Sequence, residues 1–330
     1  MAAKVLVTGG AGFIGSHLVD ELLLQNHEVV ALDNLCNGSV ENLEQALANS
    51  KFNFIEGDIL DKAVCNQSLR DIEVVYHLAC LGVRHSLHSP VENNDVNATG
   101  TLNVLEAVRN NQVKKFFYIS TSEIYGKTES FPIAETNLTK PITVYGSSKL
   151  AGEHYTNSYH EAYGLNTTVL RIFNNYGPRA HYEGDSGEVI PRTIVNTLYG
   201  KAPVIFGDGS ITRDFFYVKD TARILTELMQ YEELRGNTYN LGTGVEITIG
   251  NLIKSILKLM PGHGAEIKYL EDRPADVPRL WVDSSKLRSI VDFKSEYSFE
   301  EGLNITIDYY KKLMKGKDLT TEIPLLNWTK

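Results

Sequence analysis

The chain has 330 residues, of which 42% are hydrophobic and 22% are charged, and its formal net charge is −9. This composition is typical of a globular protein, and the negative charge argues against general affinity for nucleic acids or anionic membranes. No stretch approaches the roughly 18 apolar residues of a membrane span, and the N-terminus lacks the pattern of a signal peptide. We therefore expect a cytoplasmic protein that binds neither nucleic acid nor membrane.

The cysteine and histidine patterns predict no metal site. The three cysteines are Cys36, Cys65 and Cys80, and they do not have the spacing of metal ligands. An odd number of thiols in a chain of this length is typical of a reducing compartment. Four histidines have no acidic partner or metal-ligand spacing in the sequence, so we expect them to be structural or solvated: His77, His85, His88 and His181.

Short apolar runs alternate with helical patterns through the first half of the chain. The apolar runs, which we expect to be strands, are 5–7, 29–32, 52–56, 74–78, 116–120 and 167–171. Helical patterns lie between them, for example at 14–23 and 101–109. This alternation predicts βαβ units, a parallel sheet and right-handed connections.

The composition changes after Arg171, where segments rich in Gly, Pro and Asn mix with short helical patterns. We expect an α/β protein with a Rossmann domain, a doubly wound parallel sheet, over 1–172 and a smaller mixed α/β substrate lobe over 173–330. The chain can cross between the lobes. Because no low-complexity run or linker separates them, the lobes are expected to enclose a cleft in which ligands bind.

A glycine-rich turn follows the first predicted strand. Its sequence, Gly9-Gly10-Ala11-Gly12-Phe13-Ile14-Gly15, leads directly into a helix, which is the context of a dinucleotide-binding site. Gly9 suits the tight turn, Gly12 lets the backbone approach a pyrophosphate, and Gly15 lets the helix pack closely on the strand. Phe13 and Ile14 open the helix, whose N–H groups are positioned to bind the anion.

The second predicted strand ends at Asp33, whose carboxylate suits the ribose hydroxyls of an adenosine and repels a 2′-phosphate. No Arg or Lys follows closely, and Asn34 is uncharged, so we expect NAD rather than NADP as the cofactor. Asp58 and Ile59 follow the third strand, and they either flank the adenine or form a simple strand-end turn. Leu78, at the end of the fourth strand, is expected to line the same cofactor site.

Two further segments carry a family resemblance. Tyr145-Gly146-Ser147-Ser148-Lys149 has the YxxxK spacing, and the segment STSEIYG at 120–126 lies at the end of a predicted strand before it. Together with TGGAGFIG at 8–15, they make the chain resemble the extended short-chain dehydrogenases that act on nucleotide-sugars, over nearly its whole length. The resemblance implies a nucleotide-sugar substrate and a homodimer formed through the helices at 101–109 and 145–163.

The residue types suit the oxidation of a secondary alcohol. Tyrosine, with a pKa of about 10, is a poor base at neutral pH, so its environment must tune it. At a spacing of i, i+4 Tyr145 and Lys149 share one helix face, where the ammonium and an oxidised nicotinamide favour the phenolate. Thr121 is expected to hold the substrate hydroxyl by a hydrogen bond.

The second half of the chain supplies residues for the substrate. Asn174 follows the last predicted parallel strand and is expected to lie over the sugar or the diphosphate. By resemblance, Arg213 and Arg273 bind the diphosphate, and Asp276 binds the nucleotide ribose; a planar guanidinium suits paired phosphate oxygens. Two further residues are expected to contact the substrate: Arg84, in a loop near the nicotinamide side, and Val189.

Glu123 bears most directly on the type of reaction. After oxidation at C4, a carboxylate can remove the C5 proton and allow loss of the C6 hydroxyl, so Glu123 favours a nucleotide-hexose 4,6-dehydratase. The triplet Thr121-Ser122-Glu123 differs from the Thr-Asp-Glu of dTDP-glucose dehydratases, because Ser122 is a weaker acid. It resembles both GDP-mannose 4,6-dehydratases and UDP-glucuronate decarboxylases.

Three other functions stay open. The principal alternative is a 4-epimerase of the UDP-glucose or UDP-glucuronate type, in which Glu123 is only a structural carboxylate. A UDP-glucuronate decarboxylase comes third, because the segments around Val189 and Arg213 look more like those of epimerases and dehydratases. A non-catalytic NAD-binding protein belongs to another class, since a fold and a cofactor site do not fix a function. The presence of Thr121, Tyr145 and Lys149 together argues against it.

Overall fold

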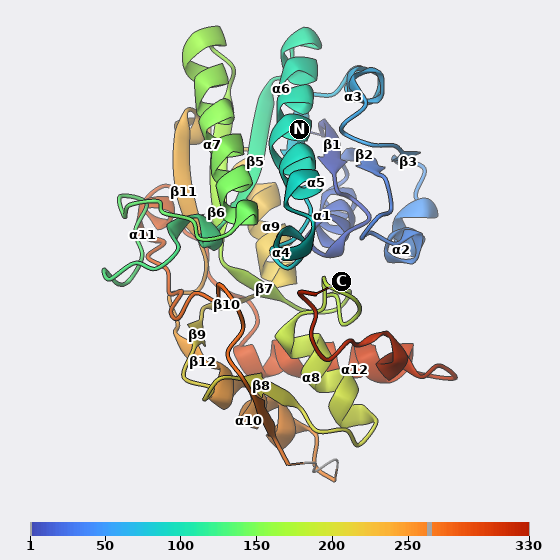
Figure 1. Cartoon of the computed structure of the whole chain (residues 1–330). Coiled ribbons are helices and arrows are strands. Elements are labelled where there is room, and N and C mark those ends of the chain that lie inside the picture. Colours follow the sequence, from blue (N-terminus) through green and yellow to red (C-terminus); the bar gives the residue numbers. More distant parts are fainter. Residues whose placement is uncertain (1, 263–265, 330) are drawn as a thin grey trace.

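A computed structural model describes residues 2–262 and 266–329, which form two lobes (Figure 1). The larger lobe contains a seven-stranded sheet in the order β11-β6-β5-β4-β1-β2-β3, and every pairing is parallel. The strands are β1 (Lys4–Thr8), β2 (Glu28–Asp33), β3 (Phe52–Glu56), β4 (Val74–His77), β5 (Lys115–Thr121), β6 (Thr167–Ile172) and β11 (Asn237–Leu241). The first six match the predicted strands, and the predicted Rossmann-type sheet is confirmed. Within the described part of the chain, no helix is both long and apolar enough to cross a membrane.

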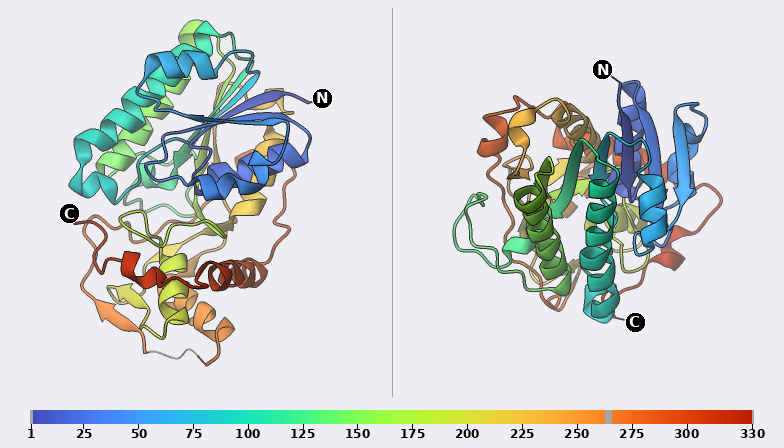
Figure 2. Two further views of the ribbon diagram at one scale, coloured as in Figure 1. Left: turned by 90° about the vertical axis from the view of Figure 1, so that its right-hand side faces the viewer. Right: turned by 90° about the horizontal axis from the view of Figure 1, so that it is seen from above.

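Helices cover both faces of this sheet (Figure 2). Successive side chains of a strand point to opposite faces, so Val5 and Val7 of β1 join one hydrophobic core and Leu6 joins the other. The first core includes side chains of α1 (Phe13–Leu24), α2 (Glu44–Leu47), α9 (Val218–Leu228) and α11 (Ser285–Arg288). The second core includes side chains of α3 (Lys62–Ser68), α6 (Thr101–Asn110) and α7 (Val144–Tyr163).

An irregular helical segment leads into α6. It consists of α4 (His85–His88), α5 (Pro90–Asn94) and a π-helical turn (Asp95–Gly100). The buried side chains of Asn93 and Asn97 both donate hydrogen bonds to the carbonyl oxygen of Leu81, each at 3.1 Å. These bonds fix the start of the loop that carries Arg84 and α4. Short 3₁₀ turns occur at Val40–Leu43, Ser122–Tyr125, Glu232–Leu234 and Leu319–Glu322.

The chain crosses between the lobes in its second half. α9 packs against α1, and β11 pairs in parallel with β6, in a register that aligns Leu241 with Ile172. Both elements therefore belong to the larger lobe, although they lie beyond the boundary expected at residue 172. The crossover adds the seventh strand, and it places the ends of β6 and β11 beside each other.

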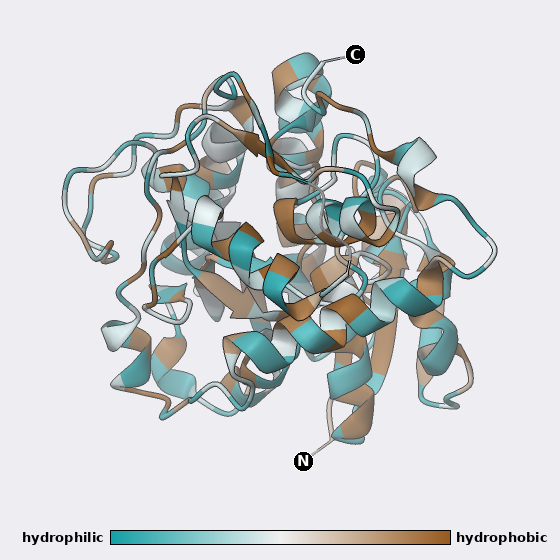
Figure 3. Cartoon of the chain, turned by 90° about the horizontal axis from the view of Figure 1, so that it is seen from below, coloured by the Kyte–Doolittle hydropathy of each residue, from teal (hydrophilic) through white to brown (hydrophobic). Residues whose placement is uncertain are grey.

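The smaller lobe combines three helices with paired short strands. The helices are α8 (Val189–Leu198), α10 (Ile249–Leu259) and α12 (Phe299–Leu313). The strand pairs are β7 (Asn174–Tyr176) with β10 (Phe215–Tyr217), β8 (Val204–Phe206) with β13 (Lys268–Leu270), and β9 (Thr212–Arg213) with β12 (Ile247–Thr248). In α10, Leu252 and Ile256 are buried while Lys254 is exposed. Hydrophobic and hydrophilic residues alternate in the same way along the helices seen from below (Figure 3).

Candidate active site

A cleft of about 480 Å³ is lined by residues of both lobes. All the candidate residues named from the sequence lie along it, although they come from distant parts of the chain: Gly9, Gly12, Phe13, Ile14, Gly15, Asp33, Asn34, Asp58, Ile59, Leu78, Arg84, Thr121, Ser122, Glu123, Tyr145, Lys149, Asn174, Val189, Arg213, Arg273 and Asp276. The structure therefore brings the predicted site residues together. Their individual roles stay predictions.

Two glycines of the turn between β1 and α1, Gly9 and Gly15, have no room for a side chain. Gly9 has φ of 69°, and a Cβ there would lie 2.8 Å from the backbone nitrogen of Ala79. A Cβ on Gly15 would lie 2.0 Å from the carbonyl oxygen of Gly9. Gly12 is the N-cap of α1 and contributes no side-chain cap, so the first N–H groups of the helix face the cleft without a side-chain partner from the described residues. Such a helix start binds a pyrophosphate.

The Asp33 carboxylate is held in place by backbone donors. Its two oxygens accept hydrogen bonds from the N–H groups of Ala11, at 3.0 Å, and Leu35, at 2.8 Å. Burial raises the pKa of Asp33, and these hydrogen bonds oppose the rise. Each oxygen keeps a lone pair for a ribose hydroxyl, whereas a phosphate at this place would meet a fixed negative charge.

The strand ends beside Asp33 complete this end of the cleft. The Asn34 amide donates to the Asp58 carboxylate at 2.9 Å. Ile59 is buried, and a Cβ on Gly100 would lie 2.6 Å from it, so the π-helical turn before α6 packs closely there. The backbone N–H of Leu78 donates to the carbonyl oxygen of Thr8 at 3.1 Å. The glycine turn, the helix start and the carboxylate together fit NAD.

Tyr145 lies in the first turn of α7, and Thr121 ends β5 opposite it. Burial raises the pKa of Tyr145 well above its usual value, the neighbouring Cys80 adds to the rise, and a hydrogen bond with the Thr121 hydroxyl opposes it. Cys80 was not singled out from the sequence as a site residue, because only the fold brings it to the tyrosine. The side chains around Tyr145 therefore favour the neutral phenol, and positive charge nearby would favour loss of its proton.

Lys149 lies one helical turn after Tyr145 and is buried. Its ammonium donates a hydrogen bond to the carbonyl oxygen of Ile119 at 2.6 Å and lies 4.4 Å from the ring centre of Tyr118. Burial lowers the pKa of Lys149. The ammonium is thus fixed against β5, at the floor of the cleft between the glycine turn and the tyrosine.

A buried ion pair holds α7 against the sheet. Arg171 of β6 donates to both carboxylate oxygens of Glu153 in α7, at 2.7 and 3.1 Å. The Ser120 hydroxyl also donates to Glu153, and Arg171 donates to the Tyr125 hydroxyl at 2.8 Å. These contacts fix the helix relative to the ends of β5 and β6, which is why Thr121 and Tyr145 face each other.

Glu123 faces the charged part of the cleft, whereas Ser122 is buried beneath it. Burial raises the pKa of Glu123, and Asp276 adds to the rise, while the guanidinium groups of Arg213 and Arg84 oppose it. A carboxyl group with a raised pKa keeps its proton to a higher pH than usual. Glu123 is therefore available as a proton donor or acceptor, or as a hydrogen-bonding group, at the sugar end of the cleft.

Arginines from both lobes converge at the far end of the cleft. Arg213 pairs with Asp276 at 2.6 Å, so these two candidate residues are partners of each other. Arg273 packs against the rings of Phe206 and Trp328, which also contact each other, and its guanidinium carbon lies 4.9 and 5.4 Å from their centres. Burial and the neighbouring guanidinium groups lower the pKa of Arg273 to about 9. An anion placed here would relieve this repulsion.

Several buried polar atoms at this end have no hydrogen-bond partner among the described residues. They are Nε of Arg84, Nε of Arg273, and the side-chain oxygens of Asn174 and Asn175. Buried donors and acceptors are normally paired, because leaving one unpaired is destabilising. Cations with open donors and a neutral amide form a suitable site for a diphosphate joined to a sugar.

Sequence reasoning missed two charged residues at the start of α8, Glu188 at its N-cap and Arg192 within the helix. Burial raises the pKa of Glu188 to about 7, and His181 and Arg84 oppose the rise. Burial lowers the pKa of Arg192 to about 10. Both line the cleft. The segment around Val189 was noted from the sequence because it resembles those of epimerases and dehydratases. The direction in which its side chains point depends on how α8 packs.

The prediction from the sequence that four histidines lack acidic partners is wrong for three of them. His85 lies 3.4 Å from Glu92, His88 lies 2.8 Å from Asp185, and His181 lies 2.7 Å from Glu183. The contact between His88 and Asp185 joins segments far apart in the sequence, so the spacing of residues along the chain could not reveal it. His77 instead hydrogen-bonds with the hydroxyls of Thr8 and Thr101, at 2.7 and 3.0 Å, and burial lowers its pKa to about 3.

The chain matches known proteins over nearly its whole length. The family described as GDP-mannose 4,6 dehydratase matches residues 6–306. The UDP-glucose 4-epimerase of Mycolicibacterium smegmatis is 34% identical over 312 residues, which cover 93% of this chain and 98% of the relative.

Solved structures of the same kind are also similar. The UDP-glucose 4-epimerase of Thermotoga maritima, solved with UDP-glucose, is 36% identical with a TM-score of 0.88, and covers 94% of this chain and 99% of its own. A dTDP-glucose 4,6-dehydratase of Streptomyces venezuelae, solved with NAD, is 29% identical with a TM-score of 0.90, and covers 96% and 99%. The resemblance inferred from the sequence is confirmed: the chain belongs to the extended short-chain dehydrogenase family of NAD-dependent nucleotide-sugar epimerases and dehydratases.

Proposed function

We propose that the chain is a nucleotide-sugar 4-epimerase that acts on a UDP-hexose and uses NAD. This replaces the 4,6-dehydratase favoured by the sequence. The observation that carries it is the acid and base set of the cleft, where Tyr145 and Thr121 face each other and Ser122 stands in place of a carboxylic acid. The names of similar proteins in Mycolicibacterium smegmatis and Thermotoga maritima support the same reaction.

In this reaction the Tyr145 phenolate accepts the proton of the sugar C4 hydroxyl while Thr121 holds that hydroxyl by a hydrogen bond. NAD held by the glycine turn and Asp33 would supply the acceptor for the C4 hydride and the donor for its return. Lys149 holds positive charge under the reacting groups. The keto-sugar then rotates and presents the opposite face of C4, and Tyr145 returns the proton to the oxygen. No net oxidation occurs, and the mass of the substrate does not change.

The arginine end of the cleft is assigned to the diphosphate. Arg84 and Arg273 each keep a buried Nε–H without a partner among the described residues, whereas the unpaired oxygen of Asn174 is an acceptor that suits a sugar hydroxyl. At the sugar end, Glu123 and Glu188 both line the cleft. Because the similar Thermotoga maritima epimerase was solved with UDP-glucose, we propose an uncharged hexose in preference to a glucuronate.

One observation keeps the 4,6-dehydratase as the second candidate. Glu123 faces the cleft with a raised pKa, as a base for the C5 proton would. Without a carboxylic acid at Ser122, however, loss of the C6 hydroxyl has no evident proton donor from this segment. The Glu123→Gln variant separates the two candidates, because a structural carboxylate tolerates this change and a C5 base does not.

The test is to incubate the purified protein with UDP-glucose, UDP-glucuronate, dTDP-glucose and GDP-mannose without added reductant. We expect UDP-galactose from UDP-glucose, identified by its NMR spectrum at unchanged mass, and at least half of the wild-type rate in Glu123→Gln. Loss of water would support the dehydratase, and loss of carbon dioxide the decarboxylase. Absence of turnover on all four would favour a non-catalytic NAD-binding protein.

The same proposal includes a cytoplasmic homodimer formed through α6 and α7. These helices pack side by side on the outside of the larger lobe (Figure 2). At the end of α7, Tyr163 is 53% exposed, and Arg109 of α6 covers its ring at 4.6 Å. Analytical ultracentrifugation is expected to give the dimer mass, and a monomer at micromolar concentration would contradict it.

A further inference from the structure

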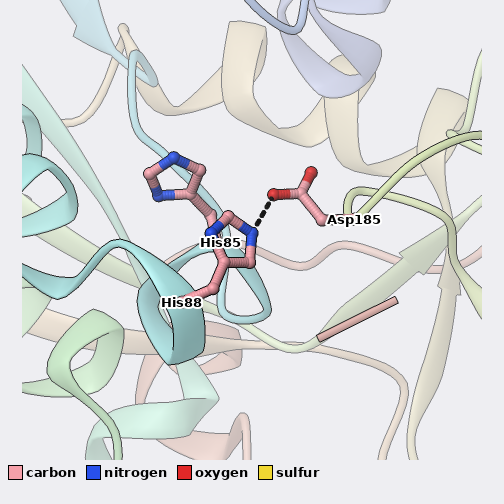
Figure 4. A group of neighbouring side chains, drawn as sticks. All are labelled: His85, His88 and Asp185. Atoms are coloured by element: carbon pink, nitrogen blue, oxygen red, sulfur yellow. Dashed lines mark hydrogen bonds and ion pairs between the residues drawn. The ribbon is translucent and has the colours of Figure 1, made fainter. Parts of the chain in front are cut away.

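Three potential metal ligands meet at the rim of the cleft (Figure 4). His85 and His88 lie on α4, and Asp185 lies on the loop between β7 and α8. Each offers a ligand atom, and these atoms lie within 4.8 Å of one another. Two of the three residues, His85 and Asp185, also line the cleft. The cluster thus joins segments that are distant in the sequence.

Each of these side chains has a separate partner that orients it. His88 contacts Asp185 through Nε2 at 2.8 Å, while its Nδ1 lies 3.0 Å from the Ser89 hydroxyl. One oxygen of Asp185 accepts a hydrogen bond from the Ser186 hydroxyl at 3.3 Å, and the other faces His88. Metal ligands in proteins usually have such outer partners, which fix the ring or the carboxylate in position.

His85 has an available ring nitrogen. Its Nε2 lies 3.4 Å from the Glu92 carboxylate, and its Nδ1 is buried with no hydrogen-bond partner among the described residues. When Nε2 carries the proton and donates to Glu92, Nδ1 holds an unused lone pair. A buried lone pair that no protein donor satisfies is what a metal ion would use.

We propose that His85, His88 and Asp185 bind one transition-metal ion of the Zn²⁺ type. Two imidazoles and one carboxylate give three ligands and leave a fourth position for water. Imidazole ligands favour Zn²⁺, Co²⁺ and Ni²⁺ over Mg²⁺ and Ca²⁺. With bonds of about 2.0–2.1 Å, a tetrahedral ion holds its ligand atoms roughly 3.4 Å apart, so His85 approaches by up to roughly 1.5 Å on binding.

The ion would connect α4 to the segment before α8 across the rim of the cleft. Among the described residues, His88 and Asp185 form the direct polar contact between the two segments, and the rings of His85 and His88 pack edge to face within α4. Transient oxidation at C4 needs no metal, so this site is separate from the proposed reaction. Its expected effect is to hold the two segments together and to raise the unfolding temperature when the metal is present.

The test is a calorimetric titration of chelator-treated protein with Zn²⁺ alone, with metal content measured after dialysis. We expect one Zn²⁺ per chain in the wild type. In His88→Gln, whose amide can still donate to Asp185, and in His85→Ala, the affinity should fall at least about 100-fold. His154→Ala is the matched control, because His154 is exposed on α7, and it should bind like the wild type.

Melting curves provide a second measurement that does not depend on the catalytic activity. Zn²⁺ should raise the unfolding temperature of the wild type and of His154→Ala, but not that of His88→Gln. The proposal is overturned if the wild type binds no Zn²⁺, or if the His85 and His88 variants bind it as tightly as the wild type does. Equal binding of Mg²⁺ would also overturn it, because Mg²⁺ requires oxygen ligands.

Discussion

The two ends of the cleft are built in different ways. The NAD end depends on one short turn and one carboxylate, and its polar groups are already fixed, as in the two backbone bonds to Asp33. The end proposed for the sugar and diphosphate draws residues from several segments, and Arg84, Arg273 and Asn174 keep buried atoms that are unpaired within the described part of the chain. The first end is ready for its ligand, whereas the second is incomplete without one. Substitutions at the two ends should therefore differ in their effects on stability and on binding.

The largest effect on activity is expected from a substitution at Tyr145, where the two ends of the cleft meet. Tyr145→Phe removes the group that takes the C4 proton, and kcat should fall about 1,000-fold, the usual range for loss of a general base. Binding of NAD and of UDP should stay within a factor of two. Tyr155→Phe, on the same helix and away from the cleft, is the control. A variant that keeps more than a tenth of the wild-type kcat would exclude Tyr145 as the base.

At the diphosphate end, Arg273→Met should raise KM for the nucleotide-sugar about 100-fold, because hydrogen bonds to a charged group are worth about 1.5–3 kcal/mol. The unfolding temperature should not fall, because the guanidinium is buried and forms no ion pair with a carboxylate of residues 2–262 or 266–329. Steady-state kinetics and melting curves measure the two effects. Arg279→Met, which removes an exposed arginine paired with Glu246, should leave KM unchanged. A destabilised Arg273 variant would contradict the idea that this end is incomplete.

At the NAD end, Gly15→Ala should differ from Arg273→Met, because it should reduce the stability of the protein as well as the binding of its ligand. Its Cβ would lie 2.0 Å from the Gly9 carbonyl oxygen, so the turn must shift. We expect a loss of about 1–3 kcal/mol of stability and loss of bound NAD. Urea denaturation and the NAD content of the purified protein report these effects. A Cβ on Gly82 meets no atom within 4 Å, so Gly82→Ala should change stability little.

The smallest effect concerns pH and Glu188. Its pKa is raised from 4.5 to about 7 in the folded protein, so the folded state holds a proton that the unfolded state releases. The resulting stabilisation is complete below pH 4.5 and is lost as the pH rises through about 7. Between these limits the wild type should lose roughly 1–3 kcal/mol relative to Glu188→Gln. Urea denaturation at several pH values measures this.

The control for this pH effect is Glu161→Gln, which removes an exposed carboxyl group from α7. Its stability should follow that of the wild type at each pH. Parallel curves for the wild type and Glu188→Gln would show that Glu188 does not hold the extra proton.

The sequence alone determined those parts of the molecule that depend on neighbours along the chain. The six predicted strands, the glycine turn, Asp33 at the end of β2, and the spacing of Tyr145 and Lys149 all follow from local backbone conformation and side-chain periodicity. The family resemblance followed from the same motifs.

Only the tertiary structure decided the contacts between distant segments. β11 joins the large sheet from the second half of the chain, Arg213 pairs with Asp276, and His88 meets Asp185. The direction in which Glu123 and Glu188 face, and hence their raised pKa values, also depends on packing. Spacing along a chain encodes short-range geometry, whereas these juxtapositions arise when both lobes bury their hydrophobic cores.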